Sequence, residues 1–66
     1  MDVYKLSKRE VEVIYLLSQG YGCTEISEKL NISINTVKFH SHNIVRKINA
    51  KNIKNAIYIA HKMELI

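Results

Sequence analysis

The segment from Ser33 to Asn49 constrains the fold most strongly, because its apolar and polar residues separate with the period of a helix. At about 100° per residue, one side of this helix collects the apolar residues Val37, Ile44, Val45 and Ile48. The opposite side spans roughly a third of the circumference and carries Asn35, Lys38, Phe39, His42 and Arg46. The pattern predicts a helix that buries one face in a core and exposes the other. Amide, cationic, imidazole and aromatic groups on one exposed face are those that contact base edges and phosphates of DNA.

The rest of the chain also indicates helices. It has 66 residues, enough for one domain with a small core, and no proline to interrupt its helical patterns. We expect an all-α, four-helix bundle with no strand, no second domain and no catalytic cleft. The predicted helices cover about residues 7–19, 24–31, 34–49 and 53–63.

Capping residues mark the ends of these helices. Ser7 and Glu10 have the spacing of a capping box at the start of the first helix, and Gly20 follows its end. We expect Thr24 to begin the second helix. The later boundaries are indicated by Asn31, Ser33 and Asn52.

The charge distribution favours a polyanionic partner. The net charge is +4, and five of the six acidic residues precede residue 29. From Lys29 onward there are seven cations against the single acid Glu64, so the positive potential should lie in the half that contains the two-faced helix. An alternative is that the lysines only keep a small protein soluble.

A short helix, a tight turn and a longer helix with an exposed cationic face form a helix-turn-helix arrangement. In that arrangement, the longer helix presents its side chains to the major groove of double-stranded DNA. The start of this helix, from Ser33 to Thr36, would place free backbone amides near phosphate.

The same residues resemble a known family, the LuxR/GerE-type helix-turn-helix domain, which is the output domain of many bacterial response regulators and quorum sensors. The resemblance covers essentially the whole chain. It is carried by LSKREVEV at residues 6–13, Gly20, EIS at 25–27, TVKFH at 36–40, Ile44, Lys47, Ile48, Asn52, Ala56, Ile57 and Ala60. The chain departs from the family pattern at Gly22, Cys23 and Thr24, in its Asn-Ile-Lys-Asn-Ala sequence at 52–56, and at Glu64, where a glycine is usual.

The resemblance implies that the third helix enters the major groove and that the fourth helix pairs two subunits. It implies base contacts from Lys38, Phe39 and His42, and phosphate contacts from Thr36, Arg46 and Lys47. The helical face adds Asn35 to the base contacts, and the capping position adds Ser33 to the phosphate contacts. We therefore expect sequence-specific DNA binding and transcription regulation.

The fourth helix carries two apolar stripes. One consists of Ile53, Ala56, Ile57 and Ala60, and this stripe is sufficient for the core. The second lies about 110° away and consists of Ile59, Met63 and Ile66. We expect the second stripe to form the interface of a homodimer, because a small core leaves little to cover it. The alternative is that it packs against Val3 and Tyr4.

Other classes of site have little support. His40 and His42 point about 200° apart on a helix, so they cannot hold one metal ion together, and we predict no metal site and no cofactor. We expect His40 to be a packed, hydrogen-bonded histidine. The single cysteine, Cys23, has no partner for an internal disulfide and no nearby cation to activate its thiol.

Enzymatic activity also has little support, because no nucleophile, base and acid occur in a recognisable pattern. We expect no small-molecule substrate and no membrane association, and a cytoplasmic location follows from the lack of a secretory signal. The alternative function is a helical protein-interaction module that docks on RNA polymerase or another regulator. RNA binding is a third alternative, but it ordinarily needs stacking aromatic residues or a single-strand groove, and only Phe39 lies on the basic face. The sequence leaves open whether these residues are a complete regulator or the output end of a longer chain.

Overall fold

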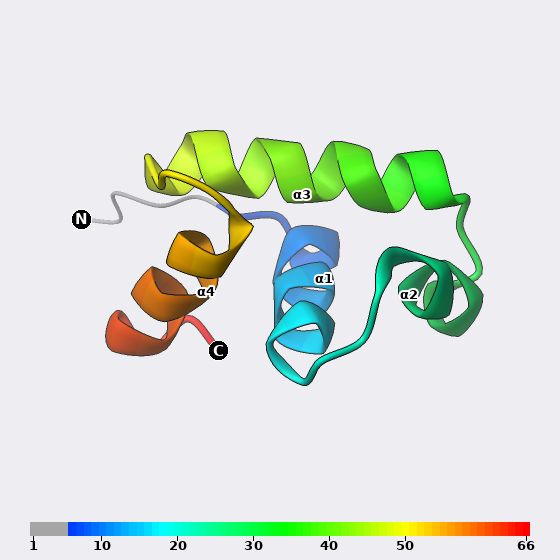
Figure 1. Cartoon of the computed structure of the whole chain (residues 1–66), viewed down its shortest axis with the longest axis horizontal. Helices are drawn as coiled ribbons and strands as arrows, with labels where there is room; N and C mark the ends of the chain where they lie inside the picture. The colour runs from blue at the N-terminus through cyan, green and yellow to red at the C-terminus, as the bar shows by residue number, and fades with distance from the viewer. Residues whose placement is uncertain (1–5) are drawn as a thin grey trace.

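The computed structural model describes residues 6–66, and within them the chain forms four helices and no strand. These are α1 (Lys8–Ser18), α2 (Cys23–Leu30), α3 (Ile34–Ile48) and α4 (Ile53–Lys62). In Figure 1, α3 forms one layer that lies across α1, α2 and α4. The arrangement is all-α, and each helix begins and ends within one residue of its predicted range.

The caps of α1 follow the prediction from its sequence. The backbone N–H of Ser7 donates to Oε1 of Glu10 at 2.8 Å, and the N–H of Glu10 donates to Oγ of Ser7 at 3.1 Å. At the other end, Gly20 has φ of +96° and the N–H of Tyr21 donates to the carbonyl of Leu16 at 3.2 Å. This is a Schellman turn, which favours glycine at the left-handed position.

The second helix begins at Cys23, one residue earlier than expected, because Gly22 and not Cys23 is its N-cap. Gly22 has no side chain to cap the helix, and its N–H instead donates to Oε1 of Glu25 at 2.9 Å. Asn31 ends the helix in the left-handed conformation, with φ of 57°. Asparagine tolerates this conformation, so the turn into α3 can be short.

The core lies where α3 crosses the other helices. Its fully buried apolar side chains come from all four helices and are Val13, Ile14, Ile26, Val37, Ile44, Ile48, Ala56 and Ala60. The apolar stripe predicted for α3 therefore points into the core, although Val45 is only partly buried. Burying each Val or Ile side chain contributes about 1.5–3 kcal/mol to the free energy of folding. The packing of these side chains therefore fixes the orientation of α3 on the other helices.

A left-handed residue also ends α4. Glu64 has φ of 58°, and the N–H of Leu65 donates to the carbonyl of Ala60 at 2.8 Å. The turn folds the chain back, so that Leu65 and Ile66 pack against the core. Glu64 thus occupies the position at which the resemblance predicts glycine, in a conformation that glycine favours.

Candidate nucleic-acid interface

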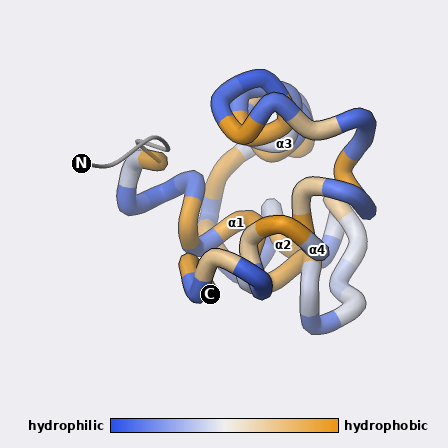
Figure 2. The backbone as a smooth tube through the Cα atoms, turned by 90° about the vertical axis from the view of Figure 1, so that its left-hand side faces the viewer, coloured by the Kyte–Doolittle hydropathy of each residue, from blue (hydrophilic) through white to orange (hydrophobic). Residues whose placement is uncertain are grey.

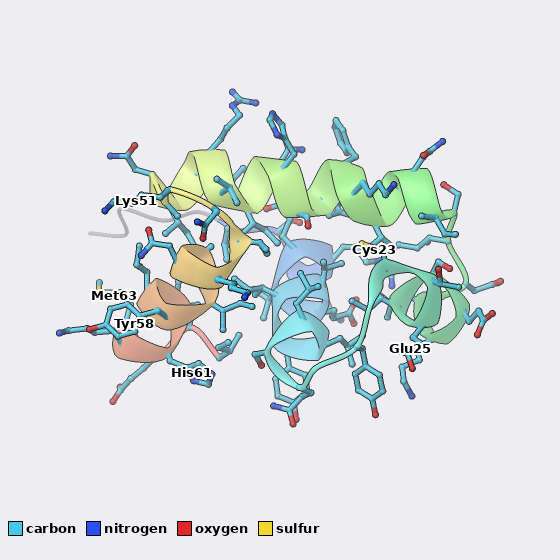
Figure 3. The ribbon with its side chains drawn as sticks, in the orientation of Figure 1. Cys23, Glu25, Lys51, Tyr58, His61 and Met63 are labelled. Atoms are coloured by element: carbon cyan, nitrogen blue, oxygen red, sulfur yellow. The ribbon has the colours of Figure 1, made fainter. Side chains whose placement is uncertain are left out.

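The side of α3 that faces away from the other helices is polar and exposed. We call it the outer face, and it consists of Asn35, Lys38, Phe39, His42 and Arg46, all of which are exposed. Figure 2 views α3 nearly along its axis and shows hydrophilic residues predominating on this side. In Figure 3, side chains extend from it away from α1, α2 and α4. The predicted segregation of this helix into a buried side and an exposed side is confirmed.

Phe39 is the unusual member of the outer face. Its side chain is 62% exposed, and the centroid of its ring is 6.0 Å from that of His40 at an interplanar angle of 59°. An isolated large apolar residue on a soluble surface is common. Here, however, the ring lies among Lys38, His42 and Arg46, which makes the face both cationic and aromatic.

His40 differs from the prediction in one respect. The side chain is packed, but its buried Nδ1 atom has no hydrogen-bond partner within residues 6–66. The expectation of a hydrogen-bonded histidine is therefore wrong at this nitrogen. Burial takes this nitrogen out of solvent without bringing a partner into hydrogen-bonding geometry, which the helical pattern could not show.

The start of α3 holds two hydroxyl groups close together. Oγ of Ser33 accepts a hydrogen bond from the N–H of Thr36 at 3.0 Å, and the two hydroxyl oxygens are 2.8 Å apart. Ser33 is exposed and Thr36 is half-buried. The first two amides of the helix, at Ile34 and Asn35, have no acceptor within the helix. Their N–H groups are therefore available to donate to an anion at this end.

An ion pair that the sequence pattern does not predict joins α3 to α1. Nζ of Lys47 lies 2.9 Å from Oε1 of Glu10, whose side chain is 5% exposed, whereas that of Lys47 is 42% exposed. The same carboxylate oxygen accepts the N–H of Ser7, so the capping box of α1 also anchors the end of α3. The capping pattern identified Glu10, but nothing in the sequence relates it to a residue 37 positions away.

The surroundings of Glu10 lower its pKa. Burial alone would raise the pKa of this carboxyl group, because it disfavours the charged form. The hydrogen bond from Lys47, the N–H of Ser7 and the positive charge of Lys47 together outweigh burial, and the pKa falls below its ordinary value. Glu10 is therefore ionised at neutral pH.

The second apolar stripe of α4 is covered more than we expected. Ile59 and Ile66 are half-buried and pack against the core, while Met63 is 51% exposed. The expectation that the small core leaves this stripe without cover is wrong for Ile59, which packs against the core from within α4, and for Ile66, which the turn at Glu64 folds back onto the core. Met63, a member of the predicted stripe, is exposed, and so is Tyr58, which lies outside the predicted stripe. Tyr58 is 60% exposed, and Nζ of Lys62 lies 5.8 Å from its ring centroid. Tyr58 and Met63 both extend away from α1 in Figure 3. The alternative contact with Val3 and Tyr4 lies outside the described residues.

Within residues 6–66, no three His, Cys, Asp or Glu side chains come together in a way that could hold a metal ion. Cys23 is half-buried at the start of α2 with its thiol free of any disulfide. No helix in the same residues is long and apolar enough to cross a membrane.

Helix α2, the turn at residues 31–33 and helix α3 form a helix-turn-helix, with α1 and α4 packed around it. The chain belongs to the luxR family of bacterial regulatory proteins, because residues 4–60 match the model of that family. Both the predicted fold and the predicted family are confirmed.

Individual relatives agree with this assignment. The chain is 43% identical over 61 residues to the oxygen regulatory protein NreC of Staphylococcus carnosus, a match that covers 92% of this chain and 28% of NreC. It is 41% identical over 66 residues to the protein of the same name in Staphylococcus epidermidis, covering 98% of this chain and 30% of that protein. A crystal structure of the response regulator ChrA, from a heme-sensing two-component system, superposes with a TM-score of 0.89 at 36% identity and covers 100% of this chain and 33% of ChrA. The chain thus spans about a third or less of the length of these relatives.

Proposed function

We propose that this domain binds double-stranded DNA sequence-specifically and regulates transcription by inserting α3 into the major groove. The observation that carries the proposal is the outer face of α3, which exposes Phe39 among two cations, an imidazole and an amide. The major groove admits an α-helix, and each base pair presents a distinct set of donors, acceptors and methyl groups there. Membership of the luxR family of bacterial regulatory proteins supports the same conclusion.

Base contacts would come from the middle of the outer face. Lys38 would donate to O6 and N7 of guanine, and the ring of Phe39 would contact the methyl group of thymine. Asn35 suits adenine, to which an amide can both donate and accept. His42 lies one turn beyond Lys38 and could donate to or accept from a base edge.

Phosphate contacts would hold α3 in the groove. Ser33 and Thr36 lie at the amino end of α3, where backbone amides and the helix dipole favour an anion. Arg46 and Lys47 lie at its carboxyl end. Lys47 can donate to a phosphate while it is paired with Glu10, because an ammonium group has three donors and this side chain is 42% exposed.

We further propose that α4 pairs two copies of the domain. Met63 and Tyr58 are its exposed apolar side chains, and Ile59 and Ile66 would contribute the parts that the core leaves uncovered. A two-fold dimer would read two half-sites of a palindromic sequence, one with each copy of α3.

We further propose that the domain binds DNA in the bacterial cytoplasm. Contact with RNA polymerase would use the surface of the domain that faces away from DNA.

Selection of duplexes from a random DNA pool tests the proposal. The purified domain should enrich a two-fold-related sequence, and it should bind that duplex more tightly than a scrambled one by several kcal/mol at fixed salt. The logarithm of the affinity should fall linearly with the logarithm of the salt concentration. Equal binding to every duplex would reject sequence recognition and favour an interaction module whose basic face binds protein.

A further inference from the structure

Charge is distributed unevenly along the axis of α3. At its amino end, the neighbouring helix α2 exposes the acids Glu25 and Glu28. At its carboxyl end, the chain exposes Arg46 on α3 and then Lys51 and Lys54 around the turn into α4. The sequence has no acidic residue between Glu28 and Glu64. The side-chain cations that can bind phosphate are therefore concentrated at the carboxyl end of α3, whereas the amino end offers phosphate only hydroxyl groups and backbone amides.

The turn that carries these lysines is held in place. Asn49 adopts the left-handed conformation with φ of 61°, and the N–H of Ala50 donates to the carbonyl of Val45 at 2.9 Å. The N–H of Lys51 donates to Oδ1 of Asn55 at 2.9 Å, and the N–H of Asn55 donates to Oδ1 of Asn52 at 2.8 Å. The backbone of the turn is fixed at both ends, so Lys51 leaves it from a defined point next to the end of α3 (Figure 3).

Lys51 and Lys54, which we call the turn lysines, have no counterion among residues 6–66. The cations of the two ion pairs in those residues are Arg9, paired with Glu12, and Lys47, paired with Glu10. Neither turn lysine lies over an aromatic ring of the described part of the chain, whereas Lys29 lies 4.6 Å from the ring centroid of Tyr21 and Lys62 lies 5.8 Å from that of Tyr58. The turn lysines are thus exposed, close in sequence and free to bind an external anion.

We propose that Lys51 and Lys54 bind DNA phosphates outside the base-reading face, in the segment between the two half-sites. This inference rests on the proposed function, in which α4 pairs two copies. Helix α4 packs under the carboxyl end of α3, with only residues 49–52 between them, so pairing through α4 would put the carboxyl end of each α3 on the dyad side of its half-site (Figure 1). The turn lysines of both copies then face the backbone of the central segment, whose phosphates also relieve the repulsion between the two like-charged turns.

The experiment measures the salt dependence of binding to the duplex recovered by selection. A Lys51→Ala/Lys54→Ala variant should lower the slope of log affinity against log salt by about 0.9 for each lysine lost. At 0.1 M salt the affinity should fall roughly five- to tenfold per lysine. The matched control for each lysine is Lys29→Ala, which removes the same charge from α2 at a position held over the Tyr21 ring and should leave the slope nearly unchanged.

A second measurement locates the contacts. Uncharged methylphosphonate linkages between the half-sites should lower the affinity of the wild-type domain for the duplex. They should have little further effect on the affinity of the Lys51→Ala/Lys54→Ala variant. A variant that keeps the wild-type slope, or that is weakened by these linkages as much as the wild type, would overturn the inference. If the wild-type domain itself does not distinguish the selected duplex from a scrambled one, it is the proposed function that fails.

Discussion

Glu10 and Lys47 connect the start of α1 to the end of α3 through a contact of 2.9 Å. Glu10 is buried and also accepts the N–H of Ser7, so loss of Lys47 would leave an ionised carboxylate in a largely dry site. Such a group is costly to leave unpaired. The contact therefore fixes the position of the carboxyl half of α3, from which Arg46 extends to solvent.

The lowered pKa of Glu10 predicts a pH dependence of folding. Because the pKa is lower in the folded than in the unfolded state, the contribution of Glu10 is fully present above about pH 4.3, the ordinary glutamate value. It should be lost as the pH falls through the pKa of the folded state. Urea unfolding between pH 7 and pH 3 should show the free energy of unfolding declining over this range.

A Glu10→Gln variant should lose about 1–2 kcal/mol of stability at pH 7, a value reduced because Lys47 is partly solvated. It should also show a smaller decline in acid than the wild type does. The matched control is Glu12→Gln, because the Glu12 side chain is 43% exposed and its partner within residues 6–66 is Arg9 on the same helix. Parallel pH profiles for Glu10→Gln and wild type would contradict this role for Glu10.

The two sides of α3 predict opposite effects of a new carboxylate. Val37→Asp should unfold the domain, since Val37 is fully buried and an unpaired charge would enter the core. Asn35→Asp should leave the fold intact, because Asn35 is exposed in the first turn, where a negative charge is favourable. Circular dichroism during heating would distinguish these outcomes, and a cooperatively folded Val37→Asp domain would argue against the observed packing.

Two substitutions on the outer face should separate base reading from phosphate binding. Lys38→Ala should weaken binding to the selected duplex by roughly 1–3 kcal/mol with a smaller effect on scrambled DNA. Arg46→Ala should weaken binding to both duplexes alike. Arg46 is a cleaner phosphate variant than Lys47, because Lys47→Ala would also break the contact with Glu10. Titrations of both duplexes at one salt concentration measure the difference, and equal losses for Lys38→Ala on both would contradict base reading.

The periodicity of α3 and the caps at Ser7, Gly20 and Asn31 could be interpreted from sequence because their physical causes are local. The contacts that required the structure join distant residues. Lys47 has the sequence features of a free surface cation, yet it pairs with Glu10, and no periodicity encodes that pairing. Likewise, the packing of Ile66 against the core depends on a turn after α4 that helical spacing alone does not predict.

The α4 surface predicts association through Met63. Met63→Glu should lower the apparent mass in sedimentation experiments and reduce binding to a two-half-site duplex more than binding to a single half-site. Met63 is preferable to Ile59 as a test position, because Ile59 packs against the core and its replacement would also reduce stability. Gln19→Glu adds the same charge at an exposed position after α1 and serves as a control. An unchanged mass together with unchanged binding to both duplexes would reject the dimer.

The final turn predicts a stabilising substitution. Glu64 is exposed and held at φ of 58°, a conformation in which a side chain costs roughly 1 kcal/mol relative to glycine. Glu64→Gly should therefore raise the stability by about 0.5–1 kcal/mol, even though glycine gives the unfolded chain more freedom to lose. Asn49→Gly, at the matching turn after α3, should gain less because asparagine already tolerates the left-handed conformation. Urea midpoints compare the two variants, and a loss of stability in Glu64→Gly would mean that the Glu64 side chain stabilises the turn by more than its backbone conformation costs.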